Sequence, residues 1–177
     1  MKTNRYHPLL VGLHWLLAFL ILFSLAMGAF SLKEIANSSP DKVFYLRGHM
    51  IAGVLILVLT LLRFAVRFAT ARPPSATTGK RFLDMIAVST HYGLYLLVVL
   101  MAGTGVALAL QAGLPDIVFG GSGAPLPESF SIFGPRLAHG VLAKLLMALA
   151  ALHILAALYH QFGKRDRLLS RMWFGRR

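Results

Sequence analysis

Histidine is the residue type in this 177-residue chain whose placement most directly suggests chemistry. The chain has seven histidines and no cysteine, and most of the histidines lie inside long apolar stretches. An imidazole inside a membrane is costly unless something binds it, so such residues indicate function. His139 and His153 are fourteen residues apart in one apolar stretch. On a helix this places them on nearly one face, about 21 Å apart along the axis. The spacing indicates two metal centres stacked through a membrane.

The composition indicates a membrane protein. The chain is 57% hydrophobic and only 14% charged, with a mean hydropathy of +0.69, whereas about a quarter of the residues of a soluble domain are charged. The lack of cysteine excludes disulfides, Cys-ligated zinc, iron–sulfur clusters and haem attached through a Cys-x-x-Cys-His motif. Any haem is therefore expected to be held by side chains alone.

Four apolar stretches are each long enough to cross a bilayer, which takes about 20 residues. They cover residues 9–32, 44–64, 82–110 and 137–162. The first stretch is longer than the apolar part of a secretory signal and contains His14, so we expect it to remain as a span. The fold class predicted is all-α: an integral membrane four-helix bundle forming one domain over residues 1–177.

Lysine and arginine set the predicted orientation, because they concentrate on the cytoplasmic side of bacterial membrane proteins. Thirteen lie on the side of the termini and the second connection, and five lie on the other side. The five are Lys33, Lys42, Arg47, Arg136 and Lys144. We therefore expect both termini in the cytoplasm. The net charge of +12 collects at the ends of apolar runs, so no nucleic-acid partner is predicted.

This orientation sorts the histidines into two depths. His49 and His139 fall near the outer face, and His14, His91 and His153 fall in the inner half. A haem iron with two axial imidazoles needs one histidine from each of two facing helices at the same depth. His49 and His139 satisfy this condition for an outer haem. His14 and His153 satisfy it for an inner haem, although depth alone leaves His91 as an alternative ligand.

Zinc is the main alternative metal, since imidazole also binds zinc. A zinc site needs three or four converging ligands, yet no two histidines are spaced i, i+4 and no carboxylate lies near the histidines of the second and fourth spans. Small residues beside the histidines, such as Gly53, Gly140 and Ala143, offer room for a flat macrocycle. The pattern favours haem over zinc.

Several short motifs carry a family resemblance. They are Gly12-Leu13-His14-Trp15, Arg47-Gly48-His49 followed by Gly53, His91 with Leu94-Tyr95-Leu96-Leu97, and the His139–His153 pair. Over almost its whole length the chain resembles the bacterial cytochrome b561 family, which shares its four-helix design with the cytochrome b subunits of Ni,Fe-hydrogenase and formate dehydrogenase. The resemblance implies two non-covalent haems b. It implies His14 and His153 as axial ligands of the inner haem iron, and His49 and His139 as those of the outer.

The short stand-alone form looks most like family members that oxidise superoxide. That resemblance implies conversion of superoxide to oxygen at the outer face, with electrons passing to ubiquinone. The outer-face candidates for attracting the anion are Arg47, Arg136 and Lys144, although the outer connections together carry a net charge of only +1.

The quinone is expected on the inner side, within reach of the membrane. His160, near the face of the inner ligand His153, is the first candidate, and Arg72 and His91 are further ones. Two other functions stay open at this point. The chain is alternatively an electron-transfer subunit for a partner dehydrogenase or hydrogenase at the outer face, or a colourless membrane anchor or transporter.

Overall fold

A computed structural model describes residues 4–74 and 79–175. Lys2, Arg176 and Arg177 of the charge count, and Ser75 of the second connection, lie outside these residues. Four helices are long and apolar enough to cross a membrane, over Pro8–Leu32, Asp41–Ala69, Arg81–Gln111 and Gly134–Lys164. Every regular element in the described part of the chain is helical. The prediction of an all-α protein with four spanning helices is confirmed.

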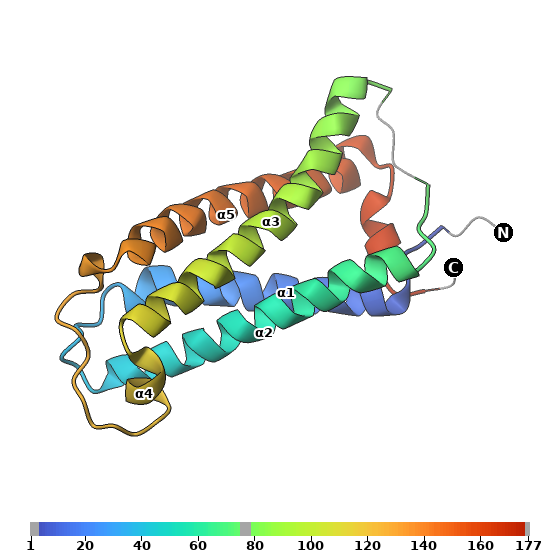
Figure 1. The fold of residues 1–177 in the computed structure, drawn as a ribbon. Helices are drawn as coiled ribbons and strands as arrows, with labels where there is room; N and C mark the ends of the chain where they lie inside the picture. The colour runs from blue at the N-terminus through green and yellow to red at the C-terminus, as the bar shows by residue number, and fades with distance from the viewer. Residues whose placement is uncertain (1–3, 75–78, 176–177) are drawn as a thin grey trace.

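The chain runs back and forth between two ends (Figure 1). The elements in order are α1 (Pro8–Ala26), α2 (Asp41–Ala69), α3 (Arg81–Gln111), α4 (Leu114–Val118) and α5 (Gly134–Leu158). A π-helical turn extends α1 over Met27–Leu32 and another extends α5 over Tyr159–Lys164, while Phe130–Ile132 and Leu168–Met172 are 3₁₀ turns. We call the end that carries both termini the terminal end, and the end that carries α4 the cap end.

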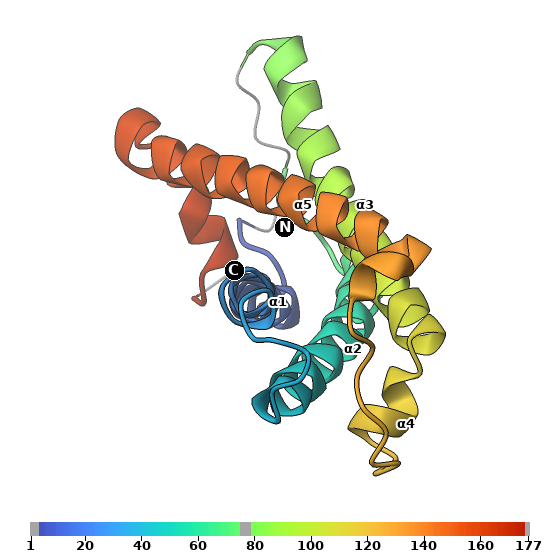
Figure 2. The same cartoon turned by 90° about the vertical axis from the view of Figure 1, so that its left-hand side faces the viewer.

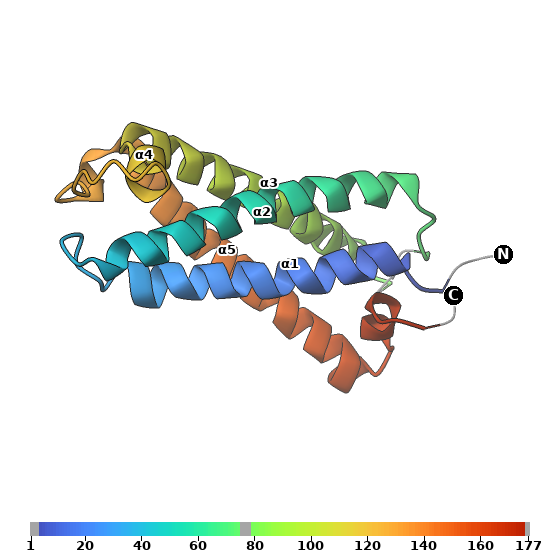
Figure 3. The same cartoon turned by 90° about the horizontal axis from the view of Figure 1, so that it is seen from below.

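The packing of the spanning helices is uneven. α1 packs on α2, α2 on α3, and α3 most extensively on α5. α5 crosses the other helices obliquely (Figures 2 and 3). In a bilayer each backbone polar group must be satisfied within the chain, and long apolar helices achieve this.

α1 begins where the sequence supplies a start signal. Pro8 occupies the first turn, where its missing N–H costs nothing, and the backbone N–H of Leu9 donates to Nδ1 of His7 at 3.2 Å. His7 is thus the N-cap of α1.

One buried layer lies between the two histidine levels. It consists of Leu17, Ile56, Val98 and Leu146, with one residue from each spanning helix. Leu146 is seven residues from both His139 and His153. The layer therefore lies midway between the two levels and keeps water out of the space between them.

The cap end has its own core and several ties between chain segments. α4 packs on α2 and α3, and Val118 is fully buried there. Lys42 is only 4% exposed, and its ammonium donates to the carbonyls of Leu32 and Ile35, the latter at 2.6 Å. The side chain of Asn37 donates to the carbonyl of Pro127 at 2.7 Å. This hydrogen bond ties the loop between α4 and α5 to the connection between α1 and α2.

Candidate functional site

α5 brings two of its histidines opposite histidines from two other helices. At the cap end, the ring centres of His139 and His49 of α2 are 6.3 Å apart, with ring planes at 79°. Nearer the terminal end, the ring centres of His153 and His14 of α1 are also 6.3 Å apart, at 75°. The predicted pairs are therefore adjacent in space, and the two pairs have nearly the same geometry.

These distances can be compared with what one metal ion between two imidazoles requires. A first-row metal ion lies about 2.0–2.1 Å from a coordinating imidazole nitrogen, which lies about 1.1 Å from its ring centre, so opposite ligands have ring centres about 6.3 Å apart. Both pairs have this separation. The ring-centre separations therefore match the spacing of two imidazoles on opposite sides of one metal ion.

Neighbouring polar groups fix how the cap-end rings are turned. Nδ1 of His139 lies 3.1 Å from the carbonyl oxygen of Met101 and 3.3 Å from Oγ1 of Thr104. Because a carbonyl only accepts, Nδ1 of His139 donates to it and Nε2 keeps a free lone pair. Nδ1 of His49 lies 3.3 Å from Oγ of Ser24. Metal-binding histidines are commonly oriented in this way by a partner of the other ring nitrogen.

Glycines make room at the same level. A Cβ at Gly105 would lie 3.1 Å from the His139 ring, so a larger residue would push that ring away. No packing neighbour lies within 4 Å of the Cβ position at Gly53, one turn along α2 from His49, or at Gly12, beside His14. At Gly140, by contrast, the guanidinium of Arg136 already occupies the nearby space, at 3.2 Å.

His91 is the third imidazole near the terminal-end pair. Its ring centre is 5.2 Å from that of His153, with the planes at 86°, and its Nδ1 donates to the carbonyl of Ala87 at 2.6 Å. A separation of 5.2 Å is too short for two imidazoles on opposite sides of one metal ion. The geometry therefore favours His14 as the partner of His153, a choice that depth alone left open.

A site with more ligands would suit zinc better than a pair does. Within residues 4–74 and 79–175, no group of three or more His, Cys, Asp or Glu side chains is arranged to hold a metal ion.

The three outer-face candidates have different surroundings. Arg47 is exposed at its helix surface, but its Nε and Nη2 donate to the carbonyl of Val118 at 3.0 and 2.6 Å. Lys144 is exposed on α5. Arg136 lines a cavity of about 930 Å³ between the α1–α2 connection and the loop before α5. Lys33 and Lys42 line the same cavity, against a single carboxylate, that of Glu128. Arg136 is therefore grouped with two lysines that we had not selected as candidates.

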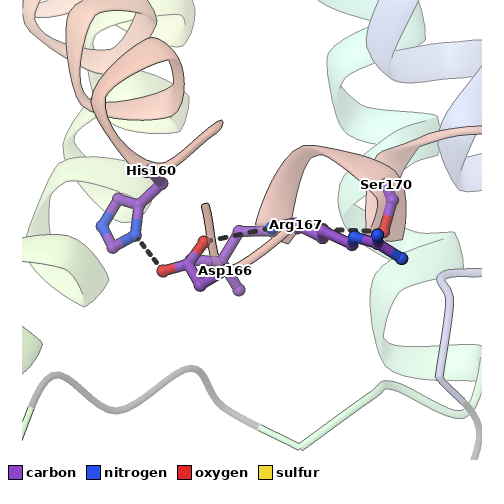
Figure 4. Close-up of polar contacts among 5 residues, drawn as sticks. His160, Asp166, Arg167 and Ser170 are labelled. Atoms are coloured by element: carbon purple, nitrogen blue, oxygen red, sulfur yellow. Dashed lines mark hydrogen bonds and ion pairs between the residues drawn. The ribbon is translucent and has the colours of Figure 1, made fainter. Parts of the chain in front are cut away.

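At the terminal end, His160 has a partner that we had not predicted. Its Nδ1 lies 2.5 Å from Oδ2 of Asp166, and Oδ1 of Asp166 accepts from the backbone N–H of Leu168 at 3.2 Å (Figure 4). Partial burial raises the pKa of Asp166, but the hydrogen bonds from His160 and Leu168 outweigh it and hold the pKa below its usual value. The one sequence signal for Asp166 is its position as the single acid among Lys164, Arg165 and Arg167.

The remaining quinone candidates lie apart from this pair. Arg72 is exposed, with its guanidinium 5.7 Å from the ring centre of Phe68. His91 is on α3 beside His153. No hydrogen bond or ion pair in the described part of the chain joins His160, Arg72 and His91 to one another.

The C-terminal turn closes over the start of α1. The indole N–H of Trp15 donates to the carbonyl of Met172 at 2.8 Å, and the backbone N–H of Tyr6 donates to the carbonyl of Arg171 at 3.1 Å. The ring of Trp15 lies 5.2 Å from that of His14. The terminal-end pair is thus connected through Trp15 to the C-terminal segment.

Comparison with known proteins gives consistent matches over nearly the whole chain. A family model described as prokaryotic cytochrome b561 matches residues 5–175. A protein named cytochrome b562 from Cereibacter sphaeroides is 33% identical over 172 residues, which cover 94% of each chain. A protein named probable superoxide oxidase CybB from Yersinia pestis is 26% identical over 176 residues, which cover 96% of each chain.

Proposed function

Because the chain belongs to the prokaryotic cytochrome b561 family and is thus a membrane cytochrome of electron transfer, we propose that it carries two haems b. The proposed axial ligands are His14 with His153, and His49 with His139. The observation that carries the proposal is the equal 6.3 Å separation of both pairs. The whole chain then acts as one unit, which relays electrons between two levels of a bilayer.

A haem between two imidazoles supplies one-electron transfer and leaves no iron position open for oxygen. The chain contributes the rest of the relay. α5 sets the two levels about 21 Å apart along its axis, as fourteen helical residues require. Leu17, Ile56, Val98 and Leu146 form a dry layer between the levels, which lowers the local dielectric constant. Met101 and Thr104 orient His139, and Ser24 orients His49.

We place the termini in the cytoplasm and the cap end outside the inner membrane. The excess of thirteen cationic residues over five supports this orientation. The C-terminal segment, with its arginines, then lies on the cytoplasmic surface.

The reaction that we propose is oxidation of superoxide at the cap end coupled to reduction of ubiquinone. Two superoxide anions each give up one electron and leave as oxygen, and one quinone takes up two electrons and two protons. A relative that matches 96% of this chain is named as a probable superoxide oxidase. Arg136 lines a cavity together with Lys33 and Lys42, and a positively charged cleft speeds the capture of an anion. The ammonium of Lys42 is bonded to two carbonyls, and that of Lys33 lies 3.8 Å from the carboxylate of Glu34, so Arg136 is the leading candidate. Arg47 and Lys144 add to the positive charge near that end.

The quinone site is proposed at the terminal end, with His160 as the residue closest to the chemistry. Asp166 accepts from Nδ1 of His160, so it fixes the orientation of the ring beside the proposed quinone site. The same imidazole passes a proton from the cytoplasmic side to the reduced quinone. Arg72 and His91 are the further residues proposed to face the quinone.

The test is stopped-flow mixing of superoxide with the purified, oxidised protein. We expect the haem absorption to change to the reduced form within the lifetime of superoxide, and added ubiquinone to reoxidise it. An absence of reduction above the spontaneous background would exclude superoxide as the donor. Co-purification of a dehydrogenase or hydrogenase that does reduce the haem would favour the alternative function as an electron-transfer subunit.

A further inference from the structure

One face of α2 carries polar side chains in which one nitrogen or oxygen atom each lacks a hydrogen-bond partner. His49, Ile56, Thr60, Arg63 and Arg67 fall within an arc of about 60° around this helix, at 100° per residue. Ile56 and Thr60 are 7% and 3% exposed, so the arc faces the interior of the bundle. The terminal-end half of the arc therefore puts one hydroxyl and two guanidiniums against the interior.

Three buried side-chain polar atoms in the described part of the chain lack a hydrogen-bond partner. They are Oγ1 of Thr60, Nε of Arg63 and Nε of Arg67. All three are on this one arc, within two turns of each other. Buried polar groups in folded proteins almost always have partners, and a buried arginine nitrogen without one is especially costly inside a membrane. The arc is thus short of an anionic group.

The position of these residues along α2 shows which of the two histidine pairs they lie beside. α2 and α5 both run from the cap end to the terminal end (Figure 1). Arg63 is fourteen residues past His49, as His153 is fourteen residues past His139. Since His49 and His139 face each other, Arg63 reaches the level of His153.

Arg63 is also held in place for this role. Its Nη1 donates to the hydroxyl of Tyr95, and its guanidinium carbon is 5.4 Å from the centre of the Tyr95 ring. Tyr95 thereby restricts the guanidinium while Nε remains unbonded. Arg67 lies one turn further along α2, on the same side.

We propose that Thr60, Arg63 and Arg67 bind the two propionate carboxylates of the haem held between His14 and His153. This inference rests on the proposed function, because it requires that haem. Two guanidiniums match two carboxylates in charge, and arginine pairs with carboxylate through strong, charge-assisted hydrogen bonds. A phosphate of an anionic lipid offers similar chemistry. Thr60 is buried in the bundle interior, a position that suits a carboxylate of a bound cofactor better than a lipid head group.

The test measures haem content and the midpoint potential of each haem in Arg63→Gln and Arg67→Gln. Reduction adds an electron, so a nearby cation favours it. We expect each variant to shift the reduction equilibrium of the haem between His14 and His153 at least tenfold toward the oxidised form, or about 59 mV for one electron. The other haem keeps its potential. A His139→Ala background, which retains only one haem, assigns the shift to the correct level.

The matched control is Arg81→Gln, which removes the same charge from the exposed start of α3. Arg63→Lys keeps the charge and should recover most of the potential, and Thr60→Val removes one hydroxyl without changing the shape. If the Arg63→Gln protein does not accumulate in the membrane, the potentials of Arg63→Lys and Thr60→Val are measured instead.

Three outcomes separate the possible failures. Potentials in the Arg63 and Arg67 variants equal to those of Arg81→Gln would overturn the propionate site. A loss of co-purifying lipid phosphate at unchanged potential would assign the site to a lipid and would also overturn the proposal. A wild-type protein without haem would instead contradict the proposed function itself.

Discussion

Replacing His139 with alanine should remove one haem and spare the other. The methyl group of alanine cannot reach a metal ion positioned by His49, whose ring centre is 6.3 Å from that of His139. The second pair lies about 21 Å away along α5, beyond the buried layer that contains Leu146. The expected stoichiometry therefore falls from two haems per chain to one, and the absorbance change per chain on reduction falls by about half.

The assay is haem extraction with protein quantitation on purified His139→Ala, His49→Ala and His91→Ala. The first two variants disrupt the same pair, so they should lose the same haem and give the same residual spectrum. His91→Ala is the control, because its ring is only 5.2 Å from that of His153 and its Nδ1 bonds the carbonyl of Ala87. It should keep both haems.

Two results would refute this reasoning. If both His139→Ala and His49→Ala kept two haems, the proposed ligands at the cap end would be wrong. If His91→Ala lost a haem while His14→Ala kept two, the ligand of the second haem would be His91.

Three further perturbations have defined outcomes. Thr104→Val removes a hydroxyl 3.3 Å from Nδ1 of His139 and should weaken haem binding at that level about tenfold. The measurement is haem retention during dilution. Unchanged retention would show that Met101 alone orients the ring. Asp166→Asn should lower the thermal unfolding midpoint at neutral pH. The hydrogen bonds that lower the pKa of Asp166 stabilise the fold only while this carboxylate is ionised, so the difference from wild type should shrink as the pH falls below 3.8. A pH-independent difference would contradict the ion pair with His160. Arg136→Gln should slow the reduction of the haem by superoxide about threefold to tenfold at low salt, and the difference should be lost at high salt. Equal rates at low salt would exclude the cavity as the entry route of superoxide.

The sequence predicted the spanning helices and the pairing of the histidines from simple periodicities. Apolar runs longer than 20 residues leave few folds available in a membrane, and the fourteen-residue spacing of His139 and His153 is a property of one helix. Both features are local, so they can be read without a structure. The choice between His14 and His91 is not local, because it depends on how α1 and α3 cross α5.

The contacts that sequence reasoning missed depend on how the chain turns and packs in three dimensions. Asp166 approaches His160 only because the helix ends in a π turn and the chain then reverses. Lys42 and Arg136 share a cavity although ninety-four residues separate them. Similarly, a helical wheel aligns Thr60, Arg63 and Arg67, but only the packed bundle shows that their polar atoms lack partners. Such features depend on the tertiary packing of the helices.

The most direct test of the account is a reduced-minus-oxidised visible spectrum of the purified chain, combined with the number of haems per polypeptide. We predict the spectrum of a six-coordinate, bis-imidazole b-type cytochrome and a stoichiometry of two. A colourless protein, or one with a single haem that is lost in neither His139→Ala nor His153→Ala, would contradict the proposal that α5 holds two haems at two depths.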